Sequence, residues 1–274
     1  MALDGAFDGQ VAIVTGGTQG LGEATARLLA ERGARGVVIN GRNTERGQAV
    51  VDALNAAGTE ARFVKGDLAN VEDVKRIVAK ADAAFGRVDA LVNAAGLTDR
   101  GTILNTSPDL FDRMFAVNVR APFFLMQDAA KIMRRERIEG AMVNILSMSG
   151  LGGQPFICAY SGSKGALMTL TKNVAFSLMH DRIRVNGLNI GWMNTPGEHS
   201  IQKSFHGADD DWLEKAAARQ PFKRLLEPVE VAKAVAYLCS DASGMMTGSI
   251  VDFDQQVLGC YDAPPQPAAR LADD

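Results

Sequence analysis

Short apolar segments alternate with longer amphipathic segments from the first dozen residues to about residue 255, and this alternation constrains the fold most. The apolar segments are rich in Val, Ile or Leu and mostly lack a polar alternation, as expected of strands buried on both faces. We predict strands at Val11–Thr15, Gly36–Asn40, Ala61–Lys65, Ala90–Asn93, Ala141–Leu146, Arg184–Asn189 and Ser249–Phe253. This pattern predicts an α/β fold with one seven-stranded parallel sheet covered by helices.

The amphipathic segments between the strands predict the helices. We place them at Gly22–Glu31, Thr44–Ala57, Val71–Phe85, near Leu110–Arg134, near Tyr160–His180 and at Val229–Leu238. With 274 residues and 47% hydrophobic content, the chain can bury a large core. Because no second domain is indicated, we predict a single domain over residues 1–260.

Two regions break the alternation. Residues 191–222 are polar and weakly periodic, and their histidines and aromatic residues are scattered: Trp192, His199, Phe205, His206 and Trp212. Such an insertion late in a sheet predicts a lid over the substrate. Residues 261–274 contain prolines and a charged end, so we predict a C-terminal tail that is disordered or lies over a neighbouring subunit.

Charge and hydropathy exclude two classes of partner. Lys plus Arg number 29 against 32 for Asp plus Glu, a net charge of −3, and no segment concentrates the basic residues as nucleic-acid binding requires. No apolar run approaches the roughly 20 residues needed to cross a bilayer, and residues 1–10 lack the features of a secretory signal. We therefore expect a cytoplasmic protein that binds neither nucleic acid nor membrane.

Metal binding and disulfide bonding are not expected. Cys158, Cys239 and Cys260 are too few and too widely spaced for a disulfide framework or a zinc site, and fit reduced buried thiols. No histidine stands at metal-ligand spacing from another His, Cys or acid. The acidic run Asp209–Asp211 is interpreted as the capped, solvated start of a helix in the predicted lid.

The first predicted strand runs directly into a glycine-rich segment, Thr15-Gly16-Gly17-Thr18-Gln19-Gly20-Leu21-Gly22, and then into a helix. Glycines let the backbone turn tightly and approach a pyrophosphate, and the helix N-terminus offers free N–H groups. A tight turn without a ligand is the alternative, but the position after the first strand favours a dinucleotide site. The expected cofactor contacts in this loop are Gly16, Thr18, Gln19, Gly20, Leu21 and Gly22.

The end of the second predicted strand bears on the choice of cofactor. In NAD sites an acid here accepts hydrogen bonds from the ribose 2′-hydroxyl and repels a 2′-phosphate. Residues 37–43 contain no acid, and Arg42 can pair with a 2′-phosphate through its planar guanidinium. A solvated Arg42 is the alternative, because Gln19 and not a second base occupies the glycine loop. We predict NADP as the cofactor, with NAD as the alternative.

Tyr160 and Lys164 open a predicted helix four positions apart, so their side chains share a face. A free tyrosine has a pKa of about 10, which a nearby cation lowers, so the phenol can exchange a proton with a carbonyl or an alcohol. Ser147, at the end of the fifth predicted strand, can hydrogen-bond to the substrate oxygen. Each residue alone is common, but together with the glycine loop they predict an oxidoreductase.

With these residues in place, the chain resembles the short-chain dehydrogenase/reductase family in its compact single-domain form, from about Gly9 to Asp254. The glycine loop matches the family's Thr-Gly-x-x-x-Gly-x-Gly, and residues 93–96 match its Asn-Asn-Ala-Gly element with Ala94 in place of the second Asn. Ser147, Tyr160 and Lys164 fall at the family's spacing, since 160 − 147 = 13 and 164 − 160 = 4.

The resemblance implies roles for further residues. Asn118 matches the asparagine that holds a water between the lysine and bulk solvent, and Lys164 also orients the nicotinamide ribose. Asp67 and Leu68 stand where the family contacts the adenine. The further cofactor contacts that it implies are Asn93, Tyr160, Lys164, Gly191, Met193 and Thr195.

Two departures from the family pattern lie near the carboxyl ends of the late strands. The Pro-Gly that follows the family's sixth strand is Ile190-Gly191 here, which we expect to loosen the turn beneath the nicotinamide. The usual Val-Asp-Gly-Gly near the end is Val251-Asp252-Phe253-Asp254. Because Phe253 and Asp254 replace the two glycines, we do not expect the family's local turn, or its substrate or subunit contact, to be kept unchanged there.

The resemblance implies a doubly wound (Rossmann) sheet with helices on both faces and a pocket at the carboxyl ends of the strands. It also implies a homotetramer in which the long helices near Leu110–Arg134 and Tyr160–His180 pair across one interface. The polar residues 191–222 favour a sugar, a polyol or another small polar substrate over a steroid or a fatty acyl chain.

We therefore predict an NAD(P)-dependent oxidoreductase that transfers a hydride between nicotinamide and an alcohol or carbonyl, with Tyr160 as acid and base. The alternative is a non-catalytic cofactor-sensing or scaffold protein on the same fold, against which the intact Asn118, Ser147, Tyr160 and Lys164 argue. An extended-branch sugar-nucleotide epimerase or dehydratase would have a differently spaced glycine loop and a longer C-terminal domain.

Overall fold

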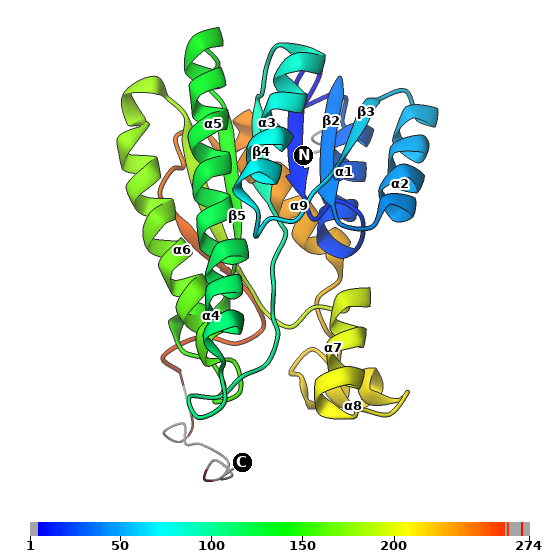
Figure 1. Cartoon of the computed structure of the whole chain (residues 1–274), viewed down its shortest axis with the longest axis vertical. Coiled ribbons are helices and arrows are strands. Elements are labelled where there is room, and N and C mark those ends of the chain that lie inside the picture. Colours follow the sequence, from blue (N-terminus) through cyan, green and yellow to red (C-terminus); the bar gives the residue numbers. More distant parts are fainter. Residues whose placement is uncertain (1–4, 261, 263–269, 271–274) are drawn as a thin grey trace.

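The computed structural model describes residues 5–260, 262 and 270. Seven parallel strands form one sheet in the order β3-β2-β1-β4-β5-β6-β7 (Figure 1). The strands are β1 (Val11–Thr15), β2 (Gly36–Gly41), β3 (Glu60–Lys65), β4 (Ala90–Asn93), β5 (Ala141–Ser147), β6 (Arg184–Ile190) and β7 (Ile250–Phe253). The chain winds outwards in opposite directions from β1 and β4, so the doubly wound, seven-stranded sheet is confirmed.

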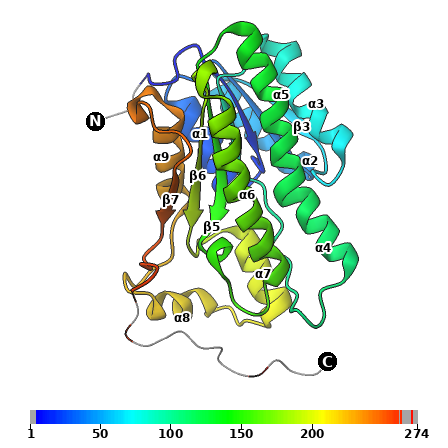
Figure 2. The ribbon, with the colours of Figure 1, turned by 90° about the vertical axis from the view of Figure 1, so that its left-hand side faces the viewer.

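The helices cover both faces of this sheet (Figure 2). Apolar residues of α1, α2 and α9 form the core on one face, and those of α3, α5 and α6 form the core on the other. The helices are α1 (Gly20–Glu31), α2 (Thr44–Ala56), α3 (Val71–Phe85), α4 (Pro108–Phe115), α5 (Ala121–Glu136), α6 (Cys158–Ser177), α7 (Pro196–His206), α8 (Trp212–Arg219) and α9 (Pro228–Cys239).

The predicted strands agree with the structure to within one residue at each end. Every residue of β1, β2, β4 and β5 is buried, because helices pack against both faces of the central strands. The predicted helix near Leu110–Arg134 begins earlier, at Pro108, where Ser107 Oγ accepts a hydrogen bond from Leu110 N (3.2 Å). A π-helical turn, Ala116–Arg120, joins α4 to α5.

Residues 191–222 contain two helices, α7 and α8, on the side where the strands end (Figure 1). The buried Trp212 at the start of α8 packs against Trp192, with 6.1 Å between ring centroids. The expectation that the acidic run caps α8 is wrong, because the Asp211 side chain makes no capping hydrogen bond and pairs with Lys215 (2.8 Å).

The two departures from the family pattern lie next to each other in space. Ile190, the last residue of β6, pairs with Phe253 of β7. A Cβ at Gly191 would overlap the carboxylate of Asp254. The Asp254 side chain thus occupies the space that a side chain at position 191 would need. The two departures are therefore neighbours in space: Ile190 and Phe253 pair across adjacent strands, and Asp254 lies against Gly191.

The remaining expectations concern cysteines, metals and the tail. Cys239 is buried, but Cys158 and Cys260 are exposed, which corrects the expectation of three buried thiols. Within the described residues, no helix has the length and apolarity that a membrane span requires, and no three His, Cys, Asp or Glu side chains are grouped to hold a metal. The predicted tail, residues 261–274, lies outside the described residues except at 262 and 270.

Candidate active site

A cavity of about 330 Å³ opens where β1, β4, β5 and β6 end and the glycine loop begins. This volume lies within the range of small-molecule sites. The predicted site residues that line it are Gly16, Thr18, Gln19, Gly20, Leu21, Gly22, Arg42, Asp67, Leu68, Tyr160, Lys164, Met193 and Thr195. Residues predicted from separate parts of the chain therefore meet in one cavity.

The glycine loop leaves no room for side chains. Gly16 (φ +66°) and Gly20 (φ +56°) adopt left-handed conformations that favour glycine. A Cβ at Gly22 would overlap the carbonyl group of Gly16, because the loop folds closely over the first turn of α1. This bare backbone at a helix N-terminus fits the pyrophosphate of a dinucleotide cofactor.

Arg42 and Asp67 line the end of the cavity that is predicted to hold the adenosine. The pKa of the Asp67 carboxyl is lowered below its usual value, although burial acts to raise it. The lowering comes from hydrogen bonds donated by Ala69 N and Arg113 and from the positive charges of Arg113 and Arg42. The Arg113 guanidinium lies 2.9 Å from the Asp67 carboxylate. Sequence reasoning did not identify Arg113, which α4 brings to the site.

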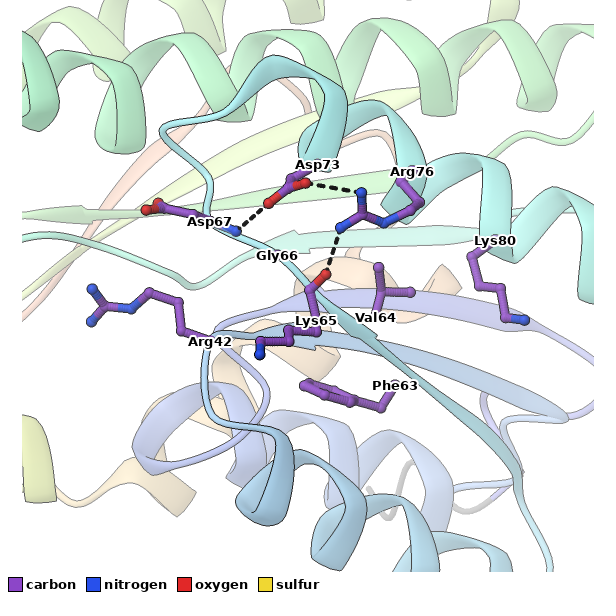
Figure 3. Close-up of a pocket in the computed structure, with 9 residues that line it drawn as sticks. All are labelled: Arg42, Phe63, Val64, Lys65, Gly66, Asp67, Asp73, Arg76 and Lys80. Atoms are coloured by element: carbon purple, nitrogen blue, oxygen red, sulfur yellow. Dashed lines mark hydrogen bonds and ion pairs between the residues drawn. The ribbon is translucent and has the colours of Figure 1, made fainter.

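A second cavity, of about 680 Å³, shares Arg42 and Asp67 with the first and continues past the end of β3 (Figure 3). Its Arg76 is held by Lys65 O (2.7 Å) and Asp73 (2.9 Å). Arg42 and the Lys65 side chain form no hydrogen bond within the described residues. Two cations are thus available near the adenosine end.

Gln19 also has a basic neighbour. Its side-chain oxygen accepts a hydrogen bond from the Arg46 guanidinium on α2. The sequence shows no second base in the glycine loop, but the fold brings one to it from α2. Nothing in the sequence marks Arg46, since it is an ordinary residue on the first turn of a helix.

Ser147, Tyr160 and Lys164 come together where β5 ends and α6 begins. Lys164 Nζ donates a hydrogen bond to Ile145 O (2.7 Å) and lies 5.7 Å from the centroid of the Tyr160 ring. Ser147 is close enough to Tyr160 to act on the pKa of its phenol, and Ser147 Oγ accepts a hydrogen bond from Ser149 N (3.2 Å). The predicted grouping of the three side chains is therefore present.

Burial dominates the acid–base properties of this group. It raises the pKa of Tyr160 above its usual value, although the hydrogen bond from Ser147 and the charge of Arg100 act to lower it. Burial also lowers the pKa of Lys164 to about 8. The expected lowering of the pKa of Tyr160 by Lys164 is not found, because burial of the phenol outweighs the charges around it.

Asn118 lies in the π-helical turn and contacts two neighbouring segments. Its Nδ2 donates hydrogen bonds to Leu97 O (2.9 Å) and Ser163 Oγ (3.0 Å), and its Oδ1 accepts from Leu97 N (2.8 Å). It therefore joins the segment after β4 to the turn of α6 that carries Lys164.

Asn93 and Gly191 lie next to residues that line the cavity but do not line it themselves. Asn93 Nδ2 donates to Asn144 Oδ1 (2.8 Å) in the neighbouring strand, and its own Oδ1 is buried without a partner in the described residues. Gly191 leaves space for Asp254. With Ser147 and Asn118, these are the predicted site residues that do not line the 330 Å³ cavity.

Sequence reasoning missed two charged residues beside Tyr160. Arg100, after β4, and Glu198, in α7, lie 4.0 Å apart with side chains only 16% and 17% exposed. The charge of Arg100 lowers the pKa of Tyr160 and that of Glu198 raises it, although burial has the larger effect. The only sequence signal for Glu198 is its position three residues after Thr195 at a helix start.

Comparisons with known proteins agree with this geometry. The model of the family described as enoyl-(acyl carrier protein) reductase matches residues 16–255. An uncharacterized oxidoreductase of Thermotoga maritima is 39% identical over 248 residues, 90% of this chain and 97% of the relative. A versicolorin reductase of Emericella nidulans is 33% identical over 255 residues, 90% of this chain and 95% of the relative.

A solved structure is similar over almost the whole chain. It is the structure of L-sorbose reductase from Gluconobacter frateurii complexed with NADPH and L-sorbose. The TM-score is 0.86 at 28% sequence identity, and the match covers 95% of this chain and 100% of the reductase chain. The family model spans residues 16–22 of the glycine loop, Ser147, Tyr160 and Lys164. The chain belongs to the short-chain dehydrogenase/reductase family, whose members are NAD(P)-dependent oxidoreductases that act on alcohol and carbonyl groups.

Proposed function

We propose that this protein reduces the carbonyl group of a small polar substrate with NADPH, and that Tyr160 donates the proton. The grouping of Ser147, Tyr160 and Lys164 beside the cavity that begins at the glycine loop carries this proposal. When bound, the nicotinamide supplies the hydride that the carbonyl carbon receives.

The side chains of the chain itself handle the carbonyl oxygen. Ser147 Oγ hydrogen-bonds to this oxygen as negative charge develops on it. Because burial raises the pKa of Tyr160, its phenol stays protonated at neutral pH and can donate this proton to the same oxygen. The carbon gains a hydride and the oxygen a proton, so the product is an alcohol.

Lys164 and Asn118 position the reacting groups. Lys164 lies beside the Tyr160 ring and is the residue that we expect to orient the nicotinamide ribose. Asn118 ties Leu97 to Ser163, next to Lys164, and is the residue that we expect to hold a water between Lys164 and bulk solvent. Asn93 and Gly191 shape the walls behind the nicotinamide.

The preference for NADP rests on Arg42. Its guanidinium is free of hydrogen bonds within the described residues, lies at the adenosine end, and has the planar shape that pairs with a 2′-phosphate. Arg46 on Gln19 adds positive charge on the same side. The NADPH complex of L-sorbose reductase supports this choice.

Residues 191–222 are proposed to form a lid within a single domain of residues 1–260. Helix α7 begins at Thr195 and brings Glu198 to the cavity wall, so a movement of α7 would open or close the substrate side. The polar character of this wall and the L-sorbose bound by L-sorbose reductase favour a sugar or polyol.

We also propose a homotetramer in the cytoplasm. Exposed apolar side chains lie on or beside the two helices expected to pair between subunits: Phe111 on α4, Phe176 on α6 and Met179 just after it. Free cysteines stay reduced in the cytoplasm. Sedimentation of the wild type and of Phe176→Asp tests the assembly, since a charge in a paired helix face would favour smaller species.

The variant Tyr160→Phe tests the proposed chemistry, because it keeps the ring and removes the proton. Turnover of NADPH with ketones should fall about 10²- to 10⁴-fold, while NADPH affinity, measured by fluorescence titration, should stay close to that of the wild type. Activity near wild type in this variant would overturn the role of Tyr160. A wild-type protein that binds NADPH but converts no ketone or alcohol would favour the cofactor-sensing alternative.

A further inference from the structure

Glu198 stands at a position where a glutamate usually caps its own helix. It follows Thr195 by three residues at the start of α7, and Thr195 Oγ1 accepts a hydrogen bond from Glu198 N (3.1 Å). In a capping box the glutamate would bond back to the main chain of the first residue. Within the described residues, Thr195 N donates no hydrogen bond to the Glu198 carboxylate. The carboxylate is therefore free to interact with groups outside its own helix start.

The two oxygens of the Glu198 carboxylate differ in their surroundings. Oε1 accepts hydrogen bonds from Trp192 Nε1 (2.8 Å) and Gln202 Nε2 (2.7 Å), which fix the orientation of the group. Oε2 has no partner in the described part of the chain, and it is not among the buried unpartnered atoms, so solvent reaches it. Glu198 lines the 330 Å³ cavity. A held carboxylate thus offers one free acceptor oxygen to a ligand.

Arg100 offsets the charge of this carboxylate. Its guanidinium lies 4.0 Å from Glu198 Oε1, is bonded to Thr98 O (2.7 Å) and His206 Nε2 (3.1 Å), and stacks over the Phe156 ring at 5.5 Å. Glu198, and not Arg100, is among the described residues that line the cavity. A ligand there meets a hydrogen-bond acceptor in a locally neutral pair, which suits a hydroxyl group better than an ammonium or a carboxylate.

Glu198 also lies close to the reacting group. Its charge acts on the Tyr160 hydroxyl, and both residues line the same cavity. A hydroxyl bound by Glu198 would therefore belong to a ligand in the same cavity as the carbonyl that Tyr160 is proposed to protonate.

We propose that Glu198 is a specificity-determining residue whose free Oε2 accepts a hydrogen bond from a hydroxyl group of the ketone substrate. The substrate class is then a hydroxy ketone, including ketose sugars, and the product is a diol or polyol. This inference rests on the proposed function, because it concerns the substrate of the same site.

Matched four-carbon ketones test the inference. Turnover with NADPH is measured for 3-hydroxybutan-2-one, butan-2-one and 3-oxobutanoate, in the wild type, Glu198→Gln and Glu198→Ala. The wild type should prefer the hydroxy ketone. The alanine variant should lose about 10- to 100-fold in kcat/KM for it, as expected for a hydrogen bond to a charged group, and keep its butan-2-one activity within about threefold.

Binding gives a readout besides turnover. Because Trp192 donates to Glu198, a ligand on Oε2 should change the fluorescence of Trp192 in the Trp212→Phe background. The hydroxy ketone should produce this change with Glu198 present and not in Glu198→Ala. The matched control is Glu214→Gln, which removes the same charge from an exposed position on α8 and should leave both the preference and the fluorescence response unchanged.

Several outcomes would overturn the inference without affecting the proposed function. Equal turnover of the hydroxy and plain ketones, or a preference for 3-oxobutanoate, would show that the wall does not select a hydroxyl. An equal loss with all ketones in Glu198→Ala would assign Glu198 a structural role. Two other outcomes concern the proposed function. If the wild type binds NADPH but reduces no ketone, both proposals are wrong. If Tyr160→Phe keeps near-wild-type activity, the proposed role of Tyr160 is wrong, but the preference for a hydroxy ketone is not affected.

Discussion

The two walls of the cavity are built by different means. On the cofactor side, the glycine loop is shaped by main chain alone, since Gly16 takes a left-handed conformation and Gly22 leaves no space for a side chain. On the proposed substrate side, residues 191–222 are held by side-chain contacts such as Trp192 with Trp212 and Glu198 with Arg100. A short local pattern specifies the first wall, whereas the second depends on residues that meet only in the folded chain.

Adding one methyl group to each wall gives the largest expected difference. In Gly22→Ala the new Cβ overlaps the Gly16 carbonyl, so NADPH affinity should fall about 10- to 100-fold and Tm should drop, as for other overpacked sites. In Gly197→Ala the new Cβ meets nothing closer than 3.7 Å on a helix, so affinity and Tm should stay near wild type. NADPH titration and thermal unfolding measure both, and equal effects would remove the contrast.

A smaller effect is expected at the proposed adenosine end of the cofactor wall. Arg42→Ala should weaken NADPH binding about tenfold, the lower range for a charge-assisted hydrogen bond, because the Arg42 side chain is exposed. NADH binding should stay nearly unchanged. Arg76→Ala is the control, because this guanidinium in the neighbouring cavity (Figure 3) is already bonded to Lys65 O and Asp73. A wild type that prefers NADH would contradict the role of Arg42.

Trp212→Ala should loosen the substrate wall without unfolding the sheet. Trp212 belongs to a small apolar cluster with Ala216 and Leu225, separate from the main cores, and its Nε1 donates to His199 Nδ1 (3.2 Å). Amide exchange in α7 and α8 should rise about tenfold or more, since an opening of one segment needs less free energy than global unfolding. Exchange in α3 and α5 should not change. Phe222→Ala, at an exposed position, is the control.

The smallest effect concerns pH and the buried Lys164. Its pKa in the folded protein is about 8, below the usual value of 10.5, so the unfolded chain binds more protons between these pH values. The contribution of Lys164 to the free energy of unfolding therefore rises with pH through this window, on the order of 1–2 kcal/mol between pH 8 and 10. The difference in urea stability between the wild type and Lys164→Met should grow in favour of the wild type, and a constant difference would contradict the lowered pKa.

The sequence was sufficient for the framework of the site. The strand bounds were predicted to within one residue because buried parallel strands read as continuous apolar runs. Tyr160 and Lys164 share a helix face at a spacing of four, which depends only on helix geometry. Thirteen of the predicted site residues line one cavity because strand ends meet at one edge of a parallel sheet.

The protonation states could not be predicted in the same way. The pKa of Tyr160 was expected to fall beside Lys164, but it is raised because burial of the phenol outweighs the charges around it. Burial is a property of the whole fold, and the spacing of two residues on a helix does not report it. The π-helical turn at Asn118 was also missed, because it differs from an α-helix by a single hydrogen-bond shift within a continuous helical pattern.

The seven-stranded parallel sheet, the glycine loop and the shared helix face of Tyr160 and Lys164 could be predicted from the sequence, because each depends on local periodicity, and the doubly wound topology was implied by the family resemblance. The charges along the cavity became known only from the folded structure: Arg113 on Asp67, Arg46 on Gln19, and the Arg100–Glu198 pair beside Tyr160. These pairs join residues from separate elements, and a free side-chain oxygen such as Glu198 Oε2 becomes apparent only when every neighbour is in place.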